Sequence, residues 1–588
     1  MTSEHGKKMS DLRVKLREAG LDGYIIPRSD EYLGEYVPAC AERLAWISGF
    51  TGSAGLAIIL VDRAAIFSDG RYTLQLEQQV EGGLWERRHI IEDKPEDWLR
   101  QMAPGKKIGF DPWTISAEAL ARFSAVEMVP VAGNLIDSIW SDRPAPPLAL
   151  ALPYPDHYAG EAAASKRQRI GALLQAAGED AAILSDGASL AWLLNIRGTD
   201  LEFCPFALGY VILHQNGHAE LFMAPEKITD ALSVHLGPDV KIAPPSDLPA
   251  ALSALHGKKV RYDPATMPVW FEMSLREAGA LIAQAPDPVA LPRACKNVAE
   301  QEGARAAHLR DALAMVRFLS WLAEAAPTGQ ETEMSAAAKL LACRAEAPFF
   351  RGESFPAISG AGENGAIIHY RVSAESNRHI RANEVYLIDS GGQYLDGTTD
   401  ITRTIWTGPG PAPESVQAHV TRVLAGMIAL ARAVFPVGVT GAHLDGLARQ
   451  ELWRAGLDYD HGTGHGVGAY LSVHEGPVSL SRAGKPVALA EGMILSDEPG
   501  YYLPGAYGIR MENLLLVQKA LFPDTRKQFL QFETLTLVPF DRALIDPSLL
   551  PAESRLWLNE YHARVRTILS PHLSGLAYDW LQAATSSL

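Results

Sequence analysis

Two pairs of acidic residues flank two predicted β-hairpins in the C-terminal half of the chain. Asp389 ends a β-rich apolar run, and Asp400 stands just before the run that returns. Glu498 and Glu512 flank a second turn in the same way. Symmetric pairing of each hairpin sets the two acids of a pair directly opposite one another, where Cβ atoms of cross-strand neighbours are about 4.5–5.5 Å apart.

Four carboxylates that face one cavity repel one another, and each ionisation raises the pKa of the next. Two divalent cations would offset the four charges, so the spacing predicts a dinuclear metal site. Any one of these acids alone would be an ordinary solvated turn residue. Asp396 falls in the first turn, and strand alternation puts Asp497 on the opposite face from Glu498, so neither is predicted to be a ligand.

The densest glycine segment, residues 461–468, presents His461 and His465. It lacks the Lys-Ser/Thr and the strand–loop–helix plan of a phosphate-binding loop, whereas its glycines would let the backbone approach a ligand or metal closely. One imidazole with four carboxylates suits manganese, with cobalt, zinc or iron as alternatives. His369 and His474 have apolar or strand-like contexts in which histidine is commonly structural, but beside this site they are predicted to stabilise a developing oxyanion.

The elements that must position these residues occur twice. Predicted helices at 300–326 and 331–345 precede the first hairpin, and predicted helices at 413–433 and 441–455 precede the second. The pattern predicts an internally duplicated α+β domain over residues 294–540, with one acidic pair from each half.

The preceding chain predicts two similar α/β domains, residues 1–150 and 151–293, because helix-like and strand-like stretches alternate in both. Ser185-Asp186 repeats Ser29-Asp30 after an apolar strand, and Leu-Ala-Trp-Leu at 190–193 repeats Leu-Ala-Trp-Ile at 44–47. Neither copy concentrates histidines and acids, which favours a scaffold or substrate-gating role.

The remaining residues, 541–588, predict a C-terminal extension with a helix at 551–569. This extension could pack on the catalytic domain or on another subunit.

Composition narrows the possible partners and compartments. The chain has 588 residues and a net charge of −16, with 47% hydrophobic and 21% charged residues. This is typical of a globular protein and argues against nucleic acid or an anionic membrane as a partner. No apolar run approaches the roughly 20 residues that span a bilayer, and the N-terminus lacks the apolar core of a signal peptide. We therefore expect a cytoplasmic protein, and the four scattered cysteines predict no disulfide framework.

The motifs around these residues resemble those of the pita-bread metallopeptidases. They are the Asp389…Asp400 spacing followed by Ile-Thr-Arg-Thr, His-Gly-Thr-Gly-His-Gly from residue 461, Ser-Asp-Glu-Pro-Gly-Tyr-Tyr from residue 496, and Arg-Met-Glu-Asn from residue 510. The resemblance covers nearly the whole chain and is closest to the cytosolic, three-domain Xaa-Pro aminopeptidases. It implies two α/β domains, a duplicated pita-bread (creatinase/aminopeptidase-like) catalytic domain and a C-terminal helical tail.

The resemblance also implies roles for individual residues. The ligands of two metal ions, usually Mn²⁺, would be Asp389, Asp400, His465, Glu498 and Glu512. Asp400 and Glu512 would bridge both ions. The active-site histidines would be His369, His461 and His474.

The family's activity is the release of an N-terminal residue that precedes proline, and the resemblance implies a homodimer. The residue types agree with that chemistry, in which a hydroxide held between two metals would attack the scissile carbonyl and Glu498 would shuttle its proton. His369 and His474 would stabilise the tetrahedral intermediate. Arg510 would orient a neighbouring group. Two alternatives are a prolidase that cuts only dipeptides and a non-catalytic pita-bread module that binds a partner protein.

Overall fold

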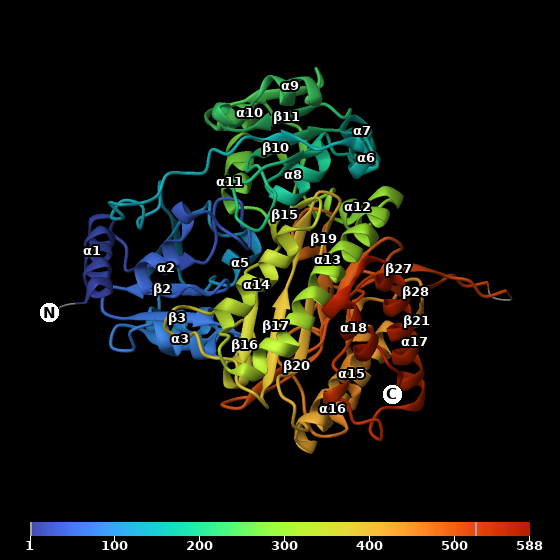
Figure 1. Cartoon of the computed structure of the whole chain (residues 1–588). Helices are drawn as coiled ribbons and strands as arrows, with labels where there is room; N and C mark the ends of the chain where they lie inside the picture. The colour runs from blue at the N-terminus through green and yellow to red at the C-terminus, as the bar shows by residue number, and fades with distance from the viewer. Residues whose placement is uncertain (1–2, 524–525) are drawn as a thin grey trace. The chain divides into compact units, whose positions relative to one another are not determined.

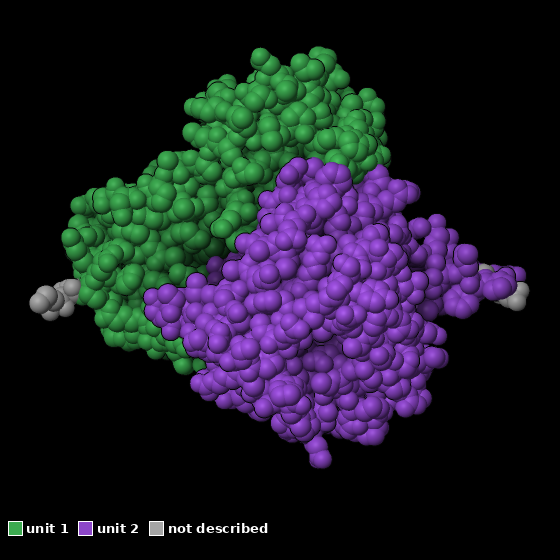
Figure 2. Space-filling model, in the orientation of Figure 1, with its two compact units in different colours: residues 1–290 green, residues 291–588 purple. Residues whose placement is uncertain are grey.

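The computed structural model describes residues 3–523 and 526–588. The chain forms two compact units, Met1–Ala290 and Leu291–Leu588, which Figure 2 colours separately. Among the described residues, no helix combines the length and the apolar character that a membrane crossing requires. Each unit has sheets and hydrophobic cores of its own.

Unit 1 begins with a six-stranded mixed sheet of order β4-β3-β2-β1-β5-β6. Its strands are β1 (Gly23–Pro27), β2 (Leu56–Leu60), β3 (Ala64–Ser68), β4 (Glu86–His89), β5 (Lys107–Phe110) and β6 (Glu127–Pro130). The accompanying helices are α1 (Glu4–Glu18), α2 (Arg43–Ser48), α3 (Thr73–Gln79), α4 (Pro95–Met102) and α5 (Ala117–Ala121). The central strand β1 pairs antiparallel with β2 and parallel with β5, so both of its edges are hydrogen-bonded, and four of its five residues are buried.

The second sheet of unit 1 repeats this topology with the order β12-β11-β10-β8-β13-β14. Its strands are β8 (Ala181–Leu184), β10 (Tyr210–His214), β11 (Ala219–Phe222), β12 (Val240–Ala243), β13 (Lys259–Tyr262) and β14 (Leu281–Gln284). Its longer helices are α7 (Ala163–Ala176), α8 (Gly187–Leu194), α9 (Asp230–Leu236), α10 (Leu248–Ser253) and α11 (Val269–Glu277). Strand β8 pairs with β10 and β13 as β1 pairs with β2 and β5. The predicted duplication is confirmed.

Unit 2 contains two helices followed by strands, twice. The first half has α13 (Val298–Ala325), α14 (Glu333–Ala345), β15 (Phe350–Glu353), β16 (Ile358–Ala361), β17 (Val385–Ser390), β18 (Gly392–Tyr394), β19 (Gly397–Thr398) and β20 (Ile401–Trp406). The second half has α15 (Glu414–Ala431), α16 (Gly441–Trp453), β21 (Val434–Pro436), β22 (Gly464–Gly466), β23 (Glu475–Leu480), β24 (Ile494–Asp497), β25 (Gly500–Leu503), β26 (Tyr507–Arg510), β27 (Asn513–Ala520) and β28 (Phe529–Thr534). The predicted internal duplication is also confirmed.

Local sequence signals fix where helices α13 and α14 begin. Asn297 and Glu300 form a reciprocal capping box at the start of α13, and Thr332 with Ser335 forms another at the start of α14. Figure 1 shows both helices beside the strands of the first half, and α14 contacts β16. These helices thereby support the strands of the first acidic pair, since Asp389 lies in β17 and Asp400 directly precedes β20.

The main core of unit 2 joins both halves and the tail. Met315 of α13, Ile388 of β17 and Met427 of α15 belong to it. So do Leu558 of α17 (Ala552–Leu569) and Leu581 of α18 (Gly575–Ala584). The tail therefore packs on the rest of unit 2.

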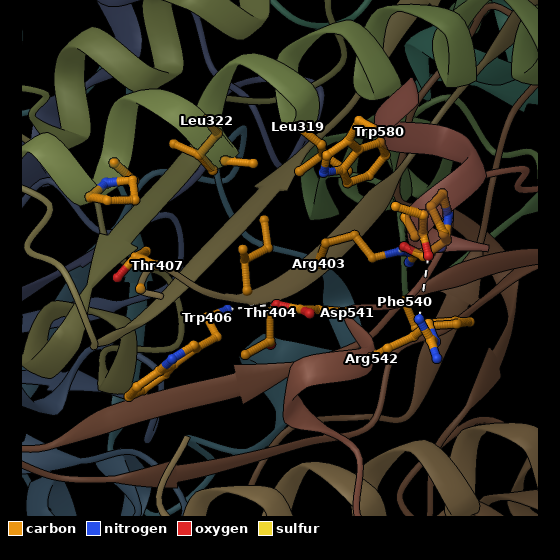
Figure 3. Close-up of a pocket in the computed structure, with 18 of the residues that line it drawn as sticks. Leu319, Leu322, Arg403, Thr404, Trp406, Thr407, Phe540, Asp541, Arg542 and Trp580 are labelled. Carbon is orange, nitrogen blue, oxygen red and sulfur yellow. Dashed lines mark hydrogen bonds between the residues drawn. The ribbon is translucent and has the colours of Figure 1, made fainter. Parts of the chain in front are cut away.

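A cavity of about 440 Å³ lies between α13, the end of β20 and the tail. Figure 3 shows Leu319, Leu322, Trp406 and Trp580 around it. None of its lining residues is a predicted ligand or catalytic residue. The cavity is separate from the acidic residues described next.

Candidate active site

The first hairpin places its two acids on one face, but not in the predicted register. Asp389 pairs with Thr402, and Tyr394 pairs with Gly397 to close the turn. The prediction that Asp389 and Asp400 lie directly opposite is therefore wrong, because the turn centres one residue later than symmetric pairing assumed. Since side chains alternate along a strand, the resulting offset of two residues keeps both acids on the same face as diagonal neighbours.

The second hairpin follows the predicted register. The ladder of β24 with β27 and that of β25 with β26 share one register, and this register sets Glu498 opposite Glu512. The backbone N–H of Glu498 donates to Thr463 O at 2.8 Å, and that of Glu512 donates to Thr402 O at 3.1 Å. The second bond links the two halves of the domain directly at the acids.

The two excluded acids have other surroundings. Asp396 forms an ion pair with Arg310 of α13. Asp497 is fully buried, and neither of its carboxylate oxygens has a hydrogen-bond partner within residues 3–523 and 526–588. Burial, with the charge of Glu498 as a second cause, raises the pKa of Asp497 well above its usual range.

Glycines allow the strand that carries His465 to fit between its neighbours β23 and β24. A Cβ added at Gly464 would lie 1.9 Å from Ser496 O, and one at Gly466 would lie 2.2 Å from Glu475 O. A Cβ atom does not approach a non-bonded atom this closely, so a side chain at either position would clash. The sequence predicted that these glycines let the backbone approach a ligand or metal, and in the structure Gly464 and Gly466 allow close packing of strands.

Asp400, His465 and Glu512 come together: one ligand atom from each lies within 4.8 Å of the others. His465 Nε2 is 3.4 Å from Asp400 Oδ2 and 3.4 Å from Glu498 Oε1. His465 Nδ1 lies 2.9 Å from Gly466 O, which leaves Nε2 directed at the acids. A backbone acceptor on one ring nitrogen is the usual support of a metal-binding imidazole.

Two buried carboxylate oxygens at this centre lack a donor. Asp389 Oδ1 and Glu512 Oε1 have no hydrogen-bond partner in the part of the chain that the structure describes. An unpaired buried oxygen on a carboxylate is costly unless a cation or a donor satisfies it. The residues present therefore fit divalent cations.

The carboxylates also perturb one another. Burial is the main cause that raises the pKa values of Asp389, Glu498 and Glu512, and neighbouring carboxylate charges raise them further. The pKa of Glu498 rises to about 7. Burial alone would lower the pKa of His465, but hydrogen bonding to Asp400 and the charges of Glu498 and Asp400 raise it to about 9. Without metal, this centre holds protons at neutral pH.

Arg510 connects the acids to an aromatic group and a further histidine. Its buried guanidinium donates to Asp389 Oδ2 at 2.7 Å and to Tyr502 OH at 2.7 Å. Tyr502 OH lies 2.9 Å from His461 Nε2. Arg510 and His461 were predicted from the sequence, but Tyr502 was not, because its only signal was its place in the motif that follows Glu498.

Thr402 is a second residue at the centre that was not predicted from the sequence. Its hydroxyl donates to Glu512 Oε2 at 2.9 Å, and Arg510 Nε lies 3.3 Å from the same hydroxyl oxygen. The corrected hairpin register explains this position, because Thr402 is the residue opposite Asp389.

The remaining predicted histidines lie on different segments. The ring of His474 stands 4.3 Å from that of His465, centroid to centroid, at an interplanar angle of 82°. Its neighbour Glu475 is buried and pairs with Lys296 at 2.5 Å. His369 is half-buried in the loop after η5 (Gly362–Ala366).

Family models match successive parts of the chain. Residues 302–519 match metallopeptidase family M24, and residues 528–588 match the C-terminal region of that family. Residues 8–139 and 142–300 match creatinase/prolidase N-terminal domains.

Relatives match over the full length. A probable Xaa-Pro aminopeptidase P of Coprinopsis cinerea is 38% identical over 100% of this chain and 99% of its own. The chain belongs to metallopeptidase family M24. Aminopeptidase P2 of Arabidopsis thaliana is also 38% identical, over 99% of this chain and 88% of its own.

A solved structure has the same fold over nearly the whole chain. X-prolyl aminopeptidase of Caenorhabditis elegans, a cytosolic enzyme with a di-nuclear active site, matches with a TM-score of 0.93 and 32% identity over 99% of this chain and 100% of its own. Dipeptidase PepE of Mycobacterium ulcerans matches 64% of this chain and 96% of its own, with a TM-score of 0.51 and 26% identity. The predicted pita-bread architecture with two N-terminal domains and a helical tail is confirmed.

Proposed function

We propose that this chain is a dinuclear, metal-dependent aminopeptidase that hydrolyses the bond between an N-terminal residue and a following proline. The observation that carries the proposal is the meeting of Asp400, His465 and Glu512 within 4.8 Å, in a centre with buried carboxylate oxygens that lack donors. Its substrates would be peptides with proline in the second position, as the name of the full-length Coprinopsis cinerea relative, a probable Xaa-Pro aminopeptidase P, indicates.

Five residues would hold two divalent cations in this proposal. Asp400 and Glu512 would be shared, Asp389 would complete one site, and His465 and Glu498 the other. Four carboxylates and one imidazole favour Mn²⁺, with Co²⁺, Zn²⁺ or Fe²⁺ as alternatives. Bound cations of this kind lower the pKa of a water molecule and polarise the scissile carbonyl.

The side chains of the protein then handle the protons and the developing charge. Glu498 accepts the proton of the attacking water and delivers it to the proline nitrogen, which carries no hydrogen of its own in the peptide bond. Ser496 Oγ donates to Glu498 Oε1 at 3.1 Å and orients this carboxylate. His369 and His474 donate to the oxyanion of the tetrahedral intermediate. Arg510 fixes Asp389, and through Tyr502 it also positions His461.

The comparisons favour an aminopeptidase over a dipeptidase. Aminopeptidase P relatives match the whole chain, whereas dipeptidase PepE matches 64% of it. A non-catalytic binding module is disfavoured because all of the proposed ligands are present. We further propose the domain limits 1–150, 151–293, 294–540 and 541–588, a cytoplasmic location like that of the nematode relative, and a homodimer.

The test is the hydrolysis of Arg-Pro-Pro by metal-stripped protein during titration with Mn²⁺, beside the Glu498→Ala variant. We expect activity to appear with about two ions bound and to be lost in the variant. Cleavage of Ala-Pro but not of Arg-Pro-Pro would indicate a prolidase. Metal binding without cleavage of either peptide would refute the proposed activity.

A further inference from the structure

One buried carboxylate gathers hydrogen bonds from a whole loop of the catalytic domain. Glu333, the first residue of α14, is fully buried. Its Oε1 accepts from Ala361 N at 2.8 Å and from Asn364 Nδ2 at 3.0 Å. Its Oε2 accepts from Tyr370 OH at 2.9 Å and from Arg378 N at 3.1 Å. Residues 361–378 are thus held at both ends and in the middle by a single side chain.

This loop carries His369. The next residue, Tyr370, makes the hydrogen bond to Glu333 in the middle of the loop. Tyr370 is buried in a small core with Ile358 of β16 and Leu387 of β17. Leu387 lies two residues before Asp389 on the same strand. Because His369 and Tyr370 share a peptide bond, fixing the Tyr370 hydroxyl on Glu333 restricts the direction in which the imidazole of His369 leaves the backbone.

The chemistry of the cluster requires a carboxylate. Two backbone N–H groups, one amide and one hydroxyl are directed at the two oxygens of Glu333, and an ionised carboxylate is a pure acceptor. A glutamine of the same shape would present an NH₂ group to some of these donors and leave at least one of them unsatisfied. An unsatisfied donor in a buried site lowers the stability of the folded protein.

We propose that Glu333 is a positioning residue that acts through Tyr370 to hold His369 in its oxyanion-stabilising orientation. The proposal rests on the proposed function, in which His369 donates to the tetrahedral intermediate. Helix α14 carries none of the proposed ligands or catalytic residues. Through Glu333 it would nevertheless help to orient the imidazole of His369.

The test is a double-mutant cycle on Arg-Pro-Pro hydrolysis with Mn²⁺-loaded full-length protein. Removal of one oxyanion donor typically costs about 10²–10³-fold in kcat, which we expect for His369→Ala. For Glu333→Gln we expect a fall in kcat of about 10-fold or more, as for loss of an orienting partner, with KM nearly unchanged. The double variant should lie within about twofold of His369→Ala, because Glu333 acts through the residue already removed.

Two further measurements separate positioning from general stability. In Glu333→Gln, hydrogen exchange should accelerate at the amides of Ala361 and Arg378, while Mn²⁺ affinity measured by calorimetry should not change. Asp541→Asn is the matched control: Asp541 also accepts two backbone N–H bonds, from Trp406 at 2.8 Å and Ala543 at 2.9 Å, and has no place in the proposed site. We expect this control to lower the melting temperature without changing kcat.

Wild-type kcat in Glu333→Gln, or multiplicative effects in the cycle, would overturn the inference. Should Glu333→Gln fail to fold, Tyr370→Phe tests the link from its other end. It removes the hydroxyl that donates to Glu333, together with the contacts of that hydroxyl with Asn364 and Ser376. We expect a smaller fall in kcat that again disappears in the His369→Ala background. Failure of the proposed function is distinguishable, since the wild-type protein would then not cleave Arg-Pro-Pro.

Discussion

Arg510 forms hydrogen bonds with both an acid of the centre and a neighbouring tyrosine. It donates to Asp389 and to Tyr502, and it contacts the hydroxyl of Thr402. A planar guanidinium reaches these partners at once, which a lysine ammonium on a flexible stem does not reproduce.

We therefore expect Arg510→Lys to weaken Mn²⁺ binding by about 10–100-fold, the usual cost of losing a group that orients a metal ligand. Titration calorimetry of metal-stripped protein measures this loss. Tyr502→Phe is the matched variant, because it keeps the ring and leaves the contact of Arg510 with Asp389 in place, so its loss should be smaller. Equal affinities for all three proteins would contradict the orienting role of Arg510.

Metal binding should also depend on pH. Because the pKa is about 7 for Glu498 and about 9 for His465 without metal, protons occupy both groups at low pH and compete with cations. Mn²⁺ affinity should rise from about pH 6 to about pH 9, with net release of protons. Calorimetry in buffers of different ionisation enthalpy measures both quantities. A flat pH profile without proton release would refute this expectation.

At the residue scale, the sequence predicted the types of residues at the centre better than their exact contacts. Residue type and strand alternation predicted Glu498, and not Asp497, as a ligand, and Glu498 Oε1 lies 3.4 Å from His465 Nε2. The place of Asp400 relative to Asp389 was missed, because a shift of one residue in a turn leaves almost no trace in the apolar pattern. Thr402, Tyr502 and Glu333 were missed for another reason: their contacts join segments far apart in the sequence.

Elements far apart in the sequence meet at a second buried ion pair. Lys296, just before α13, pairs at 2.5 Å with Glu475, the first residue of β23, and Arg293 lies 3.3 Å from the same carboxylate. Glu475 directly follows His474. The segment that precedes α13 is thereby fixed to the strand that begins directly after His474.

Lys296→Met should destabilise unit 2, because it removes one partner of a buried pair, a change that costs about 3–5 kcal/mol. The retained Arg293 should bring the loss toward the lower end of this range. Adding Glu475→Gln should recover part of the stability, since the uncompensated charge is then gone. Thermal unfolding at saturating Mn²⁺ measures all three proteins. A double variant less stable than Lys296→Met alone would contradict the pairing argument.

Helices were predicted well at the element scale where they carry strong patterns. The predicted helix at 551–569 corresponds to α17 (Ala552–Leu569), and that at 441–455 to α16 (Gly441–Trp453). Helix α18 was not predicted, because it is short and one residue, Leu581, is its only buried position. Periodicity cannot identify a face that one residue defines.

At the scale of the whole molecule, the proposed metal ligands are confined to one of the two compact units. All proposed ligands belong to Leu291–Leu588, and none to Met1–Ala290. A ligand stabilises only the cooperative unit that binds it, by about 2.7 kcal/mol at a concentration 100 times the Kd.

Calorimetric unfolding should therefore show two transitions, of which only one moves when Mn²⁺ is replaced by a chelator. The transition that stays in place should belong to residues 1–290, as hydrogen exchange or limited proteolysis during heating can establish. One transition that shifts as a whole would show that the two units unfold together.

The contacts of β20 with the strand pair β26–β27 also have an implication for the origin of the domain. Thr402 O accepts from Glu512 N, Arg403 Nη1 donates to Glu512 O at 2.6 Å, and the hydroxyl of Thr402 donates to the carboxylate of Glu512. Each half of the duplicated domain contributes one acidic pair, and the bonds that complete the centre run between the halves. A half-length ancestor would have built this centre only by pairing with a copy of itself, and gene fusion would have made that pairing permanent.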